Sequence, residues 1–462
     1  MVERHDVVVV GAGPCGLGAL RELRRLGVDD VRVLEADDRA GGLAASTVDP
    51  AGFTWDRGGH VVFSHHGEFD ALVDEVLGED RGLHDRSSWV RAAQRWVPYP
   101  LQRNLHRLPP EVAERCLIDL VDAAHGATGD AGSTDGDDLA SWAQRHFGAG
   151  IVECFFQPYN TKVWATDLAH MSSSWIAERV AEVDWREAVA RTLRGVDDVS
   201  WGPNDRFAFP TSGGTGEIWR RAAEPHADRI AYGAAVVELD PVARTVATAD
   251  GRVVGYQHLI STVPLDLLAA RTRGIPAEVA SAAAELVHTT VHVVGIGVEA
   301  PLADDRSWLY FASPEVPFYR ATNFAKYAAA NVPGGDTDRY SSWMCEVSSS
   351  ATHPIAGDDA LIDRVDAALR TTGVVAPDAP VASRHLETVP YAYPVPTRGR
   401  DDALRTLLPW FDRQGVLSRG RFGTWRYEVG NMDHAVKMGI DAARRIVDGT
   451  PEELVPADLV AR

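Results

Sequence analysis

The chain has 462 residues, of which 45% are hydrophobic, and its 66 acidic residues against 46 basic ones give a formal net charge of -20. This length predicts two or three domains, each with its own core. The charge repels nucleic acid and anionic lipid, no dense basic stripe offsets it, and no apolar run approaches the ~20 residues of a membrane span. We therefore expect a soluble cytoplasmic protein with no nucleic-acid or membrane partner.

The first forty residues predict a parallel βαβ unit. A β-branched run at Val7–Val10 precedes a glycine-rich turn, and a leucine stripe at helical spacing follows that turn. Gly27 ends the expected helix, and Val31–Leu34 returns as a second buried strand.

The rest of the chain divides into a helical block and further strands. Residues 109–201 have helical periodicity, interrupted at 126–138 by a run typical of a flexible loop. Asp250-Gly251 between two apolar runs indicates a hairpin, so residues 230–265 predict the start of a second sheet that leads Ile260–Val263 back toward the first. Later runs extend that sheet, and a final helix begins near residue 431. The later strand-like runs are Val291–Val298, Trp308–Phe311 and Trp343–Val347.

The cysteines predict neither disulfides nor a metal site. Their spacing fits no disulfide framework and no paired zinc motif, so reduced thiols are the simple interpretation. They are Cys15, Cys116, Cys154 and Cys345.

The glycine turn matches a dinucleotide-binding fingerprint. Gly11 permits the tight turn, Gly13 lets backbone N–H groups approach a pyrophosphate, and Gly16 allows close helix packing. Glu35 ends the second strand, where it can accept both ribose hydroxyls and disfavours a 2′-phosphate. An ordinary glycine-rich turn is the alternative, but strand, helix and acid are all in register.

A second glycine pair, Gly41-Gly42, follows that strand and favours FAD over NAD, because it lets the backbone pass close to a long cofactor. This pattern resembles the FAD family of amine oxidases, phytoene desaturases and sugar mutases. The loop Gly58-Gly59-His60 narrows the resemblance to UDP-galactopyranose mutases of the eukaryotic type. Further matching segments are Trp96–Pro100, Pro158–Asn160, Lys162–Ala165, Glu178–Ala181, Trp201–Asn204, Gly213–Gly216, Phe318–Thr322, Tyr393-Pro394 and Arg421–Asn431.

The resemblance implies an α/β fold and an isomerase activity. It implies a Rossmann-like FAD-binding part with the flavin loop at 1–108 and an inserted helical domain for the substrate and nucleotide at 109–205. An antiparallel sheet domain at 206–430 then returns to the FAD domain, and a helix at the flavin follows in 431–462. The family interconverts the pyranose and furanose forms of nucleotide-linked galactose, and its nucleophile is N5 of reduced FAD, which forms an adduct with the sugar. UDP-galactose is the implied substrate. Whether the chain forms a homo-oligomer stays open from the sequence.

A diphosphate site follows from the same resemblance. Arg179 and Arg320 match the arginine pair that clamps the diphosphate, a task that suits permanently charged, bidentate guanidinium groups. Each could instead be a structural ion pair. Tyr310, Tyr393 and Tyr427 match tyrosines whose hydroxyls reach the phosphates, although tyrosines are more often ordinary core or rim residues.

Further residues are implied around the flavin. His60 matches the histidine that lies against the flavin, with a neutral core histidine as the alternative, and Gly59 shares its loop. Asn431 and Met432 open the last helix, whose dipole favours the anionic reduced ring.

The nucleotide and the reductant have their own implied contacts. Some residues of this chain match family positions that surround the base and ribose of the nucleotide. Others match family positions that receive NADPH as reductant. The family commonly has Phe where this chain has Leu101 and Thr161, and Arg103 lies beside Leu101 in the sequence. The smaller side chains predict a wider base pocket, so a GDP-linked or other sugar stays an alternative substrate. The matched positions are Tyr99, Gln102, Asn160, Trp164 and Asn204 for the nucleotide, and Arg86, Ser88 and Arg421 for NADPH.

Two other functions stay open from the sequence. A flavin oxidoreductase that removes hydride would share the front fingerprint, but it would lack the diphosphate residues and the Gly-Gly-His loop. A silent nucleotide-sugar-binding protein would not need all four of the residues His60, Arg179, Arg320 and Tyr427.

Overall fold

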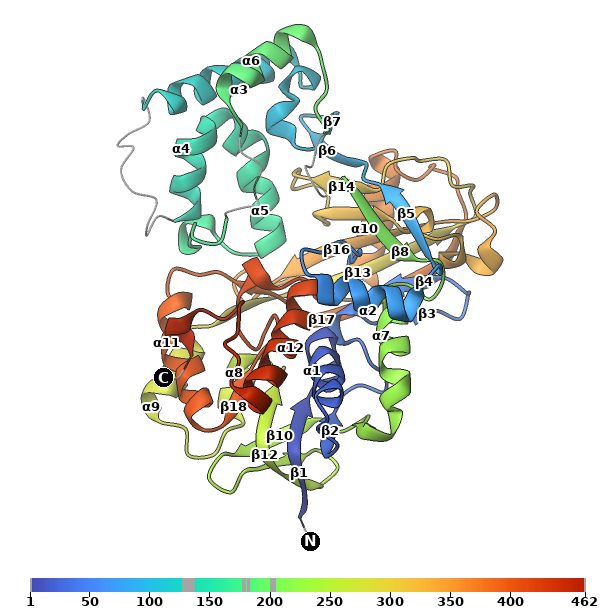
Figure 1. Ribbon diagram of the computed structural model, residues 1–462. Helices are drawn as coiled ribbons and strands as arrows, with labels where there is room; N and C mark the ends of the chain where they lie inside the picture. The colour runs from blue at the N-terminus through green and yellow to red at the C-terminus, as the bar shows by residue number, and fades with distance from the viewer. Residues whose placement is uncertain (1, 127–137, 177–179, 181–182, 200–204, 461–462) are drawn as a thin grey trace.

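The computed structural model describes residues 2–126, 138–176, 180, 183–199 and 205–460. Two large sheets lie one above the other in Figure 1, and a helical arm stands over the second sheet. Both termini lie in the part of the molecule that contains the first sheet. No described helix is long and apolar enough to cross a membrane.

The first sheet contains the predicted βαβ unit. β1 (Glu3–Val10) pairs in parallel with β2 (Val31–Leu34) on one side and with β12 (Val253–Ser261) on the other. Helix α1 (Pro14–Arg25) connects β1 to β2 and starts with a proline, which suits a first turn whose N–H groups have no helical partner. The remaining strands are β9 (Ile230–Ala231), β10 (Val236–Asp240), β11 (Thr245–Thr248) and β18 (Val416–Ser418).

The hairpin around Asp250-Gly251 is confirmed, but its predicted place in a second sheet is wrong. β11 and β12 pair antiparallel, as expected. β12 then runs beside β1 from Val254 to Ser261, so residues 230–261 belong to the first sheet. The pairing of β12 with β1 joins segments far apart in sequence, which local periodicity does not reveal.

The second sheet is mainly antiparallel and combines two early strands with five later ones. Its order is β17-β13-β16-β15-β14-β6-β7, and only β14 and β6 pair in parallel. The predicted strands at 291–298, 308–311 and 343–347 all lie in it. Its members are β6 (Ser88–Ala92), β7 (Arg95–Pro98), β13 (Val287–Val298), β14 (Trp308–Phe311), β15 (Arg320–Asn323), β16 (Ser341–Ser349) and β17 (Val381–Val395).

The helical arm packs directly on the second sheet. Trp164 of the arm and Trp308 of the sheet belong to a single hydrophobic core, so the arm shares its interior with the sheet. The arm consists of α3 (Pro110–Ala124), α4 (Leu139–Ile151), a π-helical turn (Val152–Phe156), α5 (Gln157–Trp164) and α6 (Trp185–Arg194).

The last helix, α12 (Met432–Asp448), packs closely on α1 (Figure 1). A Cβ on Gly439 would lie 2.0 Å from the carbonyl oxygen of Cys15, and one on Gly18 would lie 2.7 Å from that of Val436. The two glycines therefore let the helix backbones touch. This contact brings the N-terminal end of α12 beside the glycine turn.

Smaller elements surround these layers. β3 and β4 form a short hairpin, and β5 pairs with β8. Their bounds are Ser46–Val48, Thr54–Asp56, Arg81–Asp85 and Arg206–Pro210, and the other helices are α2 (Gly67–Leu77), α7 (Gly216–Ala223), α8 (Leu265–Ala270), α9 (Ala277–Ala284), α10 (Asp359–Thr371) and α11 (Arg400–Arg413).

Candidate active site

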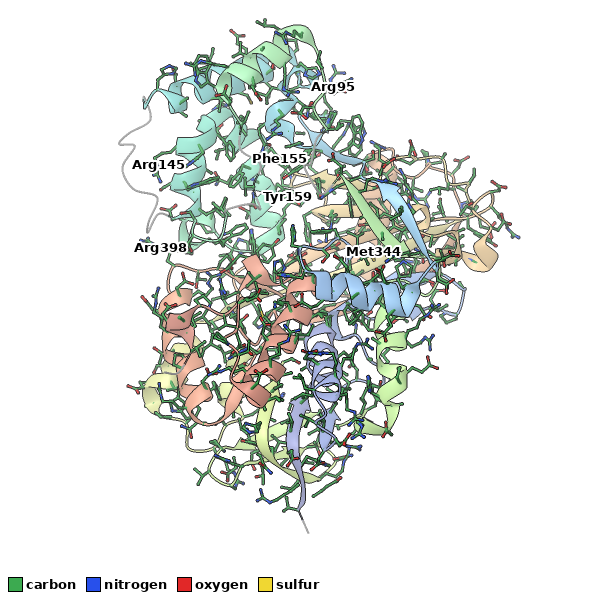
Figure 2. All side chains as sticks on the ribbon, in the orientation of Figure 1. Arg95, Arg145, Phe155, Tyr159, Met344 and Arg398 are labelled. Atoms are coloured by element: carbon green, nitrogen blue, oxygen red, sulfur yellow. The ribbon has the colours of Figure 1, made fainter. Side chains whose placement is uncertain are left out.

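A cavity of about 1110 Å³ is lined by residues of both sheets, the arm and the start of α12. Its volume exceeds the roughly 300–1,000 Å³ of ordinary small-molecule pockets, so it has room for an extended cofactor and a second ligand. Phe155 and Tyr159 line it from the arm, where Figure 2 labels them facing the second sheet.

The glycine turn forms one wall of this cavity. Gly11 has a φ of +102°, and a Cβ on Gly16 would lie 1.9 Å from the carbonyl oxygen of Gly11. A Cβ on Gly42 would lie 3.4 Å from the Cα of Gly13, so the two glycine loops nearly touch. Gly11, Gly13 and Gly42 line the cavity, whereas Gly16 and Gly41 lie behind it. Exposed backbone at a helix N-terminus fits the pyrophosphate of a dinucleotide.

Glu35 lies at the carboxyl end of β2 and faces the same cavity. Its Oε2 accepts a hydrogen bond of 2.5 Å from the Ala12 amide, and Oε1 accepts one of 2.8 Å from the Asp37 amide. Burial raises the pKa of the Glu35 carboxyl, and the backbone donors oppose that shift. The hydrogen bonds from these two backbone amides hold the carboxylate where a ribose would reach it.

The loop at 58–60 reaches into the cavity between the two sheets. Gly58 has a φ of +139°, and a Cβ on Gly59 would lie 3.2 Å from the Arg320 guanidinium. Burial, with the nearby Arg421 charge, lowers the pKa of His60 to about 4. His60 is therefore neutral at pH 7, as the alternative interpretation expected, yet it also lines the cavity.

Arg320 is both an ion-pair partner and a cavity residue. Its Nε and Nη2 donate to Oε1 and Oε2 of Glu346 at 2.8 and 2.7 Å. Glu346 also accepts from the Gly59 amide at 3.0 Å and from the Tyr319 hydroxyl at 2.5 Å. Burial raises the pKa of the Glu346 carboxyl, but the Arg320 charge and these donors outweigh burial and hold the pKa below its ordinary value.

Aromatic side chains enclose the space opposite the guanidinium. Tyr310 packs against Tyr99 and Tyr159, with ring centroids 5.4 and 5.6 Å apart. Tyr393 and Tyr427 both pack edge-on against Trp164, at 5.9 and 4.8 Å. All six of these side chains line the cavity. The three tyrosines predicted to bind the phosphates therefore lie around one space.

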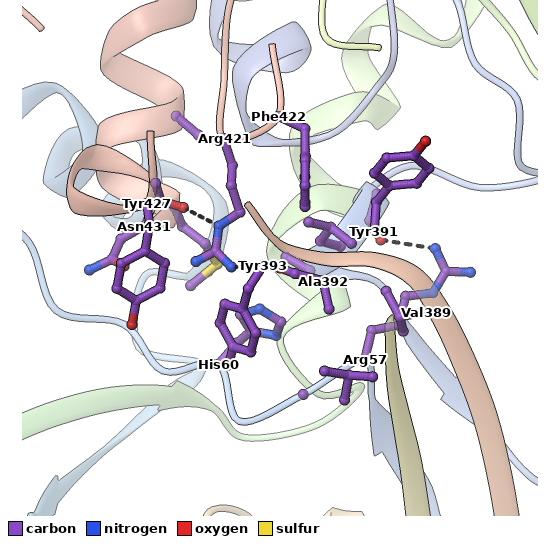
Figure 3. Close-up of a pocket in the computed structure, with 18 of the residues that line it drawn as sticks. Arg57, His60, Val389, Tyr391, Ala392, Tyr393, Arg421, Phe422, Tyr427 and Asn431 are labelled. Atoms are coloured by element: carbon purple, nitrogen blue, oxygen red, sulfur yellow. Dashed lines mark hydrogen bonds between the residues drawn. The ribbon is translucent and has the colours of Figure 1, made fainter. Parts of the chain in front are cut away.

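Arg421 lies over two of these tyrosines. Its guanidinium carbon is 5.5 Å from the Tyr393 ring centroid and 5.9 Å from that of Tyr427, and Figure 3 shows Tyr393 and His60 beside it. Nε donates to the Gly430 carbonyl at 2.7 Å, which fixes the side chain next to the start of α12.

Arg86 lines another part of the cavity wall. Its guanidinium carbon lies 4.8 Å from the Trp308 ring centroid, and its Nε donates to the Ser88 hydroxyl at 3.4 Å. Ser88 is itself buried and does not line the cavity. The structure thus brings Arg86 and Arg421 to one cavity, with Ser88 behind Arg86.

The start of α12 completes the cavity. Asn431 is the residue before the helix, and both Asn431 and Met432 line the cavity (Figure 3 labels Asn431 near Tyr427). The positive end of the helix dipole therefore points at the space where a reduced, anionic flavin ring would be favoured.

The predicted nucleotide residues have mixed placements. Tyr99, Gln102, Asn160 and Trp164 line the cavity, and so does Arg103. Leu101 is fully buried in the core that the arm and the second sheet share, and Thr161 is not part of the lining, so the wider base pocket stays a prediction. Arg179 and Asn204 lie outside the described residues.

Sequence reasoning missed three residues of the site. Phe155 and Tyr159 stack at 5.0 Å, and their spacing of four in a helical segment was a readable signal. Glu346 had no such signal, because it stands alone in a fully buried strand and acquires its donors only through folding.

Comparisons with known proteins agree with this geometry. A family model described as flavin containing amine oxidoreductase matches residues 14–447. A solved structure of reduced UDP-galactopyranose mutase is 37% identical to the chain, covers 96% of it and 94% of its own length, and superposes with a TM-score of 0.91.

Two curated proteins match over a shorter stretch. Lysine-specific histone demethylase 2 of Homo sapiens is 42% identical over 73 residues, and putrescine oxidase of Kocuria rosea is 51% identical over 76 residues. Each alignment covers 16% of this chain, and the aligned parts are only 9% and 15% of those proteins. The long matches decide the family: the chain belongs to the flavin-containing amine oxidoreductases and, within them, to the UDP-galactopyranose mutases.

Proposed function

We propose that this protein interconverts the galactopyranose and galactofuranose forms of UDP-galactose, with reduced FAD bound. The observation that carries the proposal is the shared cavity: the glycine cradle, His60 and the Arg320 and tyrosine cluster all open into it. A hydride-removing oxidase needs the first of these features but has no use for a diphosphate clamp.

Ring contraction requires the bond between C1 and the phosphate to break and re-form while the sugar stays in place. When bound, reduced FAD supplies the nucleophile that holds the sugar. Gly11, Gly13 and Gly42 would hold its pyrophosphate, and Glu35 its ribose. Asn431 and Met432 at the start of α12 would favour negative charge on its ring, because the N-terminal end of a helix is positive.

The chain's own task is to hold the leaving diphosphate. In a protein with a net charge of -20, Arg320 provides local positive charge, and Glu346 keeps its guanidinium in place. Tyr310, Tyr393 and Tyr427 can donate hydroxyl hydrogens without adding charge. Arg179 is proposed as the second clamping arginine on the family resemblance.

His60 would act next to the flavin as a neutral group. Because its Nδ1 is buried and has no hydrogen-bond partner among the described residues, the imidazole can donate or accept one bond to a bound ligand. At pH 7 it adds no positive charge that would compete with Arg320 for the diphosphate.

For the nucleotide we propose uracil, placed among Tyr99, Gln102, Asn160 and Trp164, with Asn204 from the resemblance. The argument for a guanine base rests on Arg103, which lines the cavity but whose Nη1 lies 3.6 Å from Oδ2 of Asp198. For the reductant we propose NADPH, with Arg86 and Arg421 near its 2′-phosphate and Ser88 supporting Arg86.

The test uses the purified holoprotein reduced with dithionite. Incubated separately with UDP-galactofuranose and GDP-galactofuranose, it should convert the UDP sugar to the pyranose isomer, as followed by chromatography. The oxidised holoprotein is the matched control and should convert neither sugar. Oxidation of the sugar, or equal conversion by the oxidised protein, would contradict the proposal, and preference for the GDP sugar would contradict only the choice of base.

A further inference from the structure

A cluster of metal-binding side chains lies beside the cavity rather than in it. His65 Nδ1 is 3.4 Å from Oδ2 of Asp433, and His434 Nδ1 is 3.0 Å from Oδ1 of the same carboxylate. The three candidate ligand atoms all lie within 4.8 Å of one another. His65 precedes α2, and the other two residues are in the first turn of α12.

The central carboxylate is buried without a full set of partners. Asp433 has a side-chain exposure of 0%, and its Oδ1 has no hydrogen-bond partner among the described residues. Oδ2 accepts from the backbone amide of His65 at 3.2 Å. A buried carboxylate oxygen without a donor is costly unless a cation or a proton donor satisfies it.

The nearest lysine does not reach that oxygen. Lys437, one turn further along α12, donates instead to Glu68 and Glu453, at 3.3 and 2.9 Å. The oxygen is paired instead with Nδ1 of His434, which is also buried and lies 3.0 Å away. A buried imidazole and a buried carboxylate oxygen thus stand side by side.

We propose that His65, Asp433 and His434 bind one first-row divalent transition-metal ion. Imidazole and carboxylate are the ligands that Zn²⁺, Ni²⁺ and Fe²⁺ accept, and two ligand atoms 3.0 Å apart can both bind one ion as adjacent ligands at about 2.0–2.2 Å. Because His65 is 43% exposed, an ion can enter from solvent.

The ion would join two segments that both shape the cavity. His65 follows the loop that carries Gly59 and His60, and Asp433 follows Asn431 and Met432. His65 and Asp433 are 368 residues apart in sequence, so the metal would cross-link the loop to the last helix. None of the three ligands is among the residues that line the described cavity, so the site is separate from the proposed reaction.

The test is a calorimetric titration, in which Zn²⁺ is added to holoprotein that has been treated with EDTA and dialysed. We expect saturable binding of one Zn²⁺ per chain. His65→Ala and Asp433→Asn should each weaken binding by more than the roughly 10–100-fold that loss of an outer-sphere partner costs. Mg²⁺ and Ca²⁺, which prefer oxygen ligands, should not compete.

Matched controls separate this site from surface histidines and from misfolding. His353→Ala removes an exposed histidine outside the cluster and should leave Zn²⁺ binding unchanged. Co²⁺ should give ligand-field absorption beyond the flavin bands in the unmodified protein and lose it in His65→Ala, while bound flavin reports that the variant is folded. Absence of stoichiometric binding, or binding unchanged in both ligand variants, would overturn the proposal.

Discussion

Glu346 holds Arg320 through both carboxylate oxygens, at 2.8 and 2.7 Å, and the same oxygens bind the Gly59 amide and the Tyr319 hydroxyl. Four donors therefore converge on one carboxylate that is only 2% exposed. The flavin loop and the diphosphate clamp share this anchor. Arg320 itself keeps 19% exposure, so its other face remains available to the cavity.

Glu346→Gln should destabilise the protein. The change removes the negative charge and leaves the Arg320 guanidinium without its counter-charge, and breaking a buried pair costs about 3–5 kcal/mol. Because Arg320 is partly exposed, we expect the lower end of that range, measured as the free energy of unfolding in denaturant. KM for the nucleotide sugar should rise as the clamp loses its fixed position.

The matched control is the double variant Arg320→Met with Glu346→Leu. Replacing both charges by apolar groups of similar size should recover most of the lost stability, yet it should abolish sugar conversion because the clamp is gone. A Glu346→Gln protein as stable as the unmodified one would show that the carboxylate does not anchor Arg320.

Because of His60, we expect the folded protein to lose stability when the pH is lowered below 6.5. Its pKa is lowered from 6.5 to about 4 in the folded protein, so between these values the unfolded chain binds a proton that the folded one does not. Stability from this group is complete above pH 6.5 and falls by at most about 3 kcal/mol as pH decreases to 4. His60→Gln should flatten the pH dependence by that amount in denaturant titrations. Parallel curves for the two proteins would contradict it.

Lys162 should stabilise the contact between the arm and the second sheet. Its Nζ donates to the carbonyls of Phe311, Ser313 and Phe318, at 2.9, 3.1 and 2.6 Å, and burial lowers its pKa to about 7. Lys162→Met leaves these carbonyls without that donor, at a cost of about 1–3 kcal/mol in unfolding free energy.

The control for Lys162 is Lys326→Met. Lys326 is 21% exposed, and it pairs with the fully exposed Asp305 carboxylate and donates to the carbonyl of the same residue. Because Asp305 is in solvent, we expect Lys326→Met to cost less than Lys162→Met, about 0–1 kcal/mol for the ion pair. Lys162→Met should also weaken UDP binding, because α5 carries Tyr159 and Asn160. Equal unfolding free energies for the two variants would remove the proposed role of the buried lysine.

Gly439→Ala should release the flavin. A Cβ there would lie 2.0 Å from the Cys15 carbonyl oxygen, so α12 must move away from α1 and from the glycine turn. Bound flavin per chain, measured by absorbance after gel filtration, should fall. Gly399→Ala is the control, because a Cβ at Gly399 meets no atom within 4 Å and its φ is not in the left-handed region. Retained flavin in Gly439→Ala would contradict the prediction.

Local patterns predicted the parts of the fold that depend on neighbours in sequence. The run at Val7–Val10, the glycine turn and the helix to Arg25 are encoded within thirty residues, and the Asp250-Gly251 hairpin within twenty. The structure has each of them. The residues of the candidate site were found through resemblance, and most of them meet at one cavity.

Long-range pairing explains what sequence did not reveal. β12 pairs with the edge of β1 opposite to β2, and it follows β1 by more than two hundred residues. Local patterns therefore assigned residues 230–261 to the second sheet instead of the first. Glu346 and the cluster of His65, Asp433 and His434 acquire their chemistry only when distant segments meet. Neighbouring residues can also face opposite ways: Gln102 lines the cavity, whereas Leu101 lies in the core, and sequence alone does not distinguish the two.

Leu101→Phe should leave the choice of base unchanged. Leu101 is fully buried in the arm core, so a larger side chain overpacks that core and costs about 1–3 kcal/mol of stability without entering the cavity. The ratio of UDP to GDP affinity, from titrations of the reduced protein, should equal that of the unmodified protein. Arg103→Ala is the matched change on the cavity wall, and it should alter the ratio if the arginine contacts the base. A ratio that shifts with Leu101→Phe but not with Arg103→Ala would place the base against Leu101 and contradict the structure.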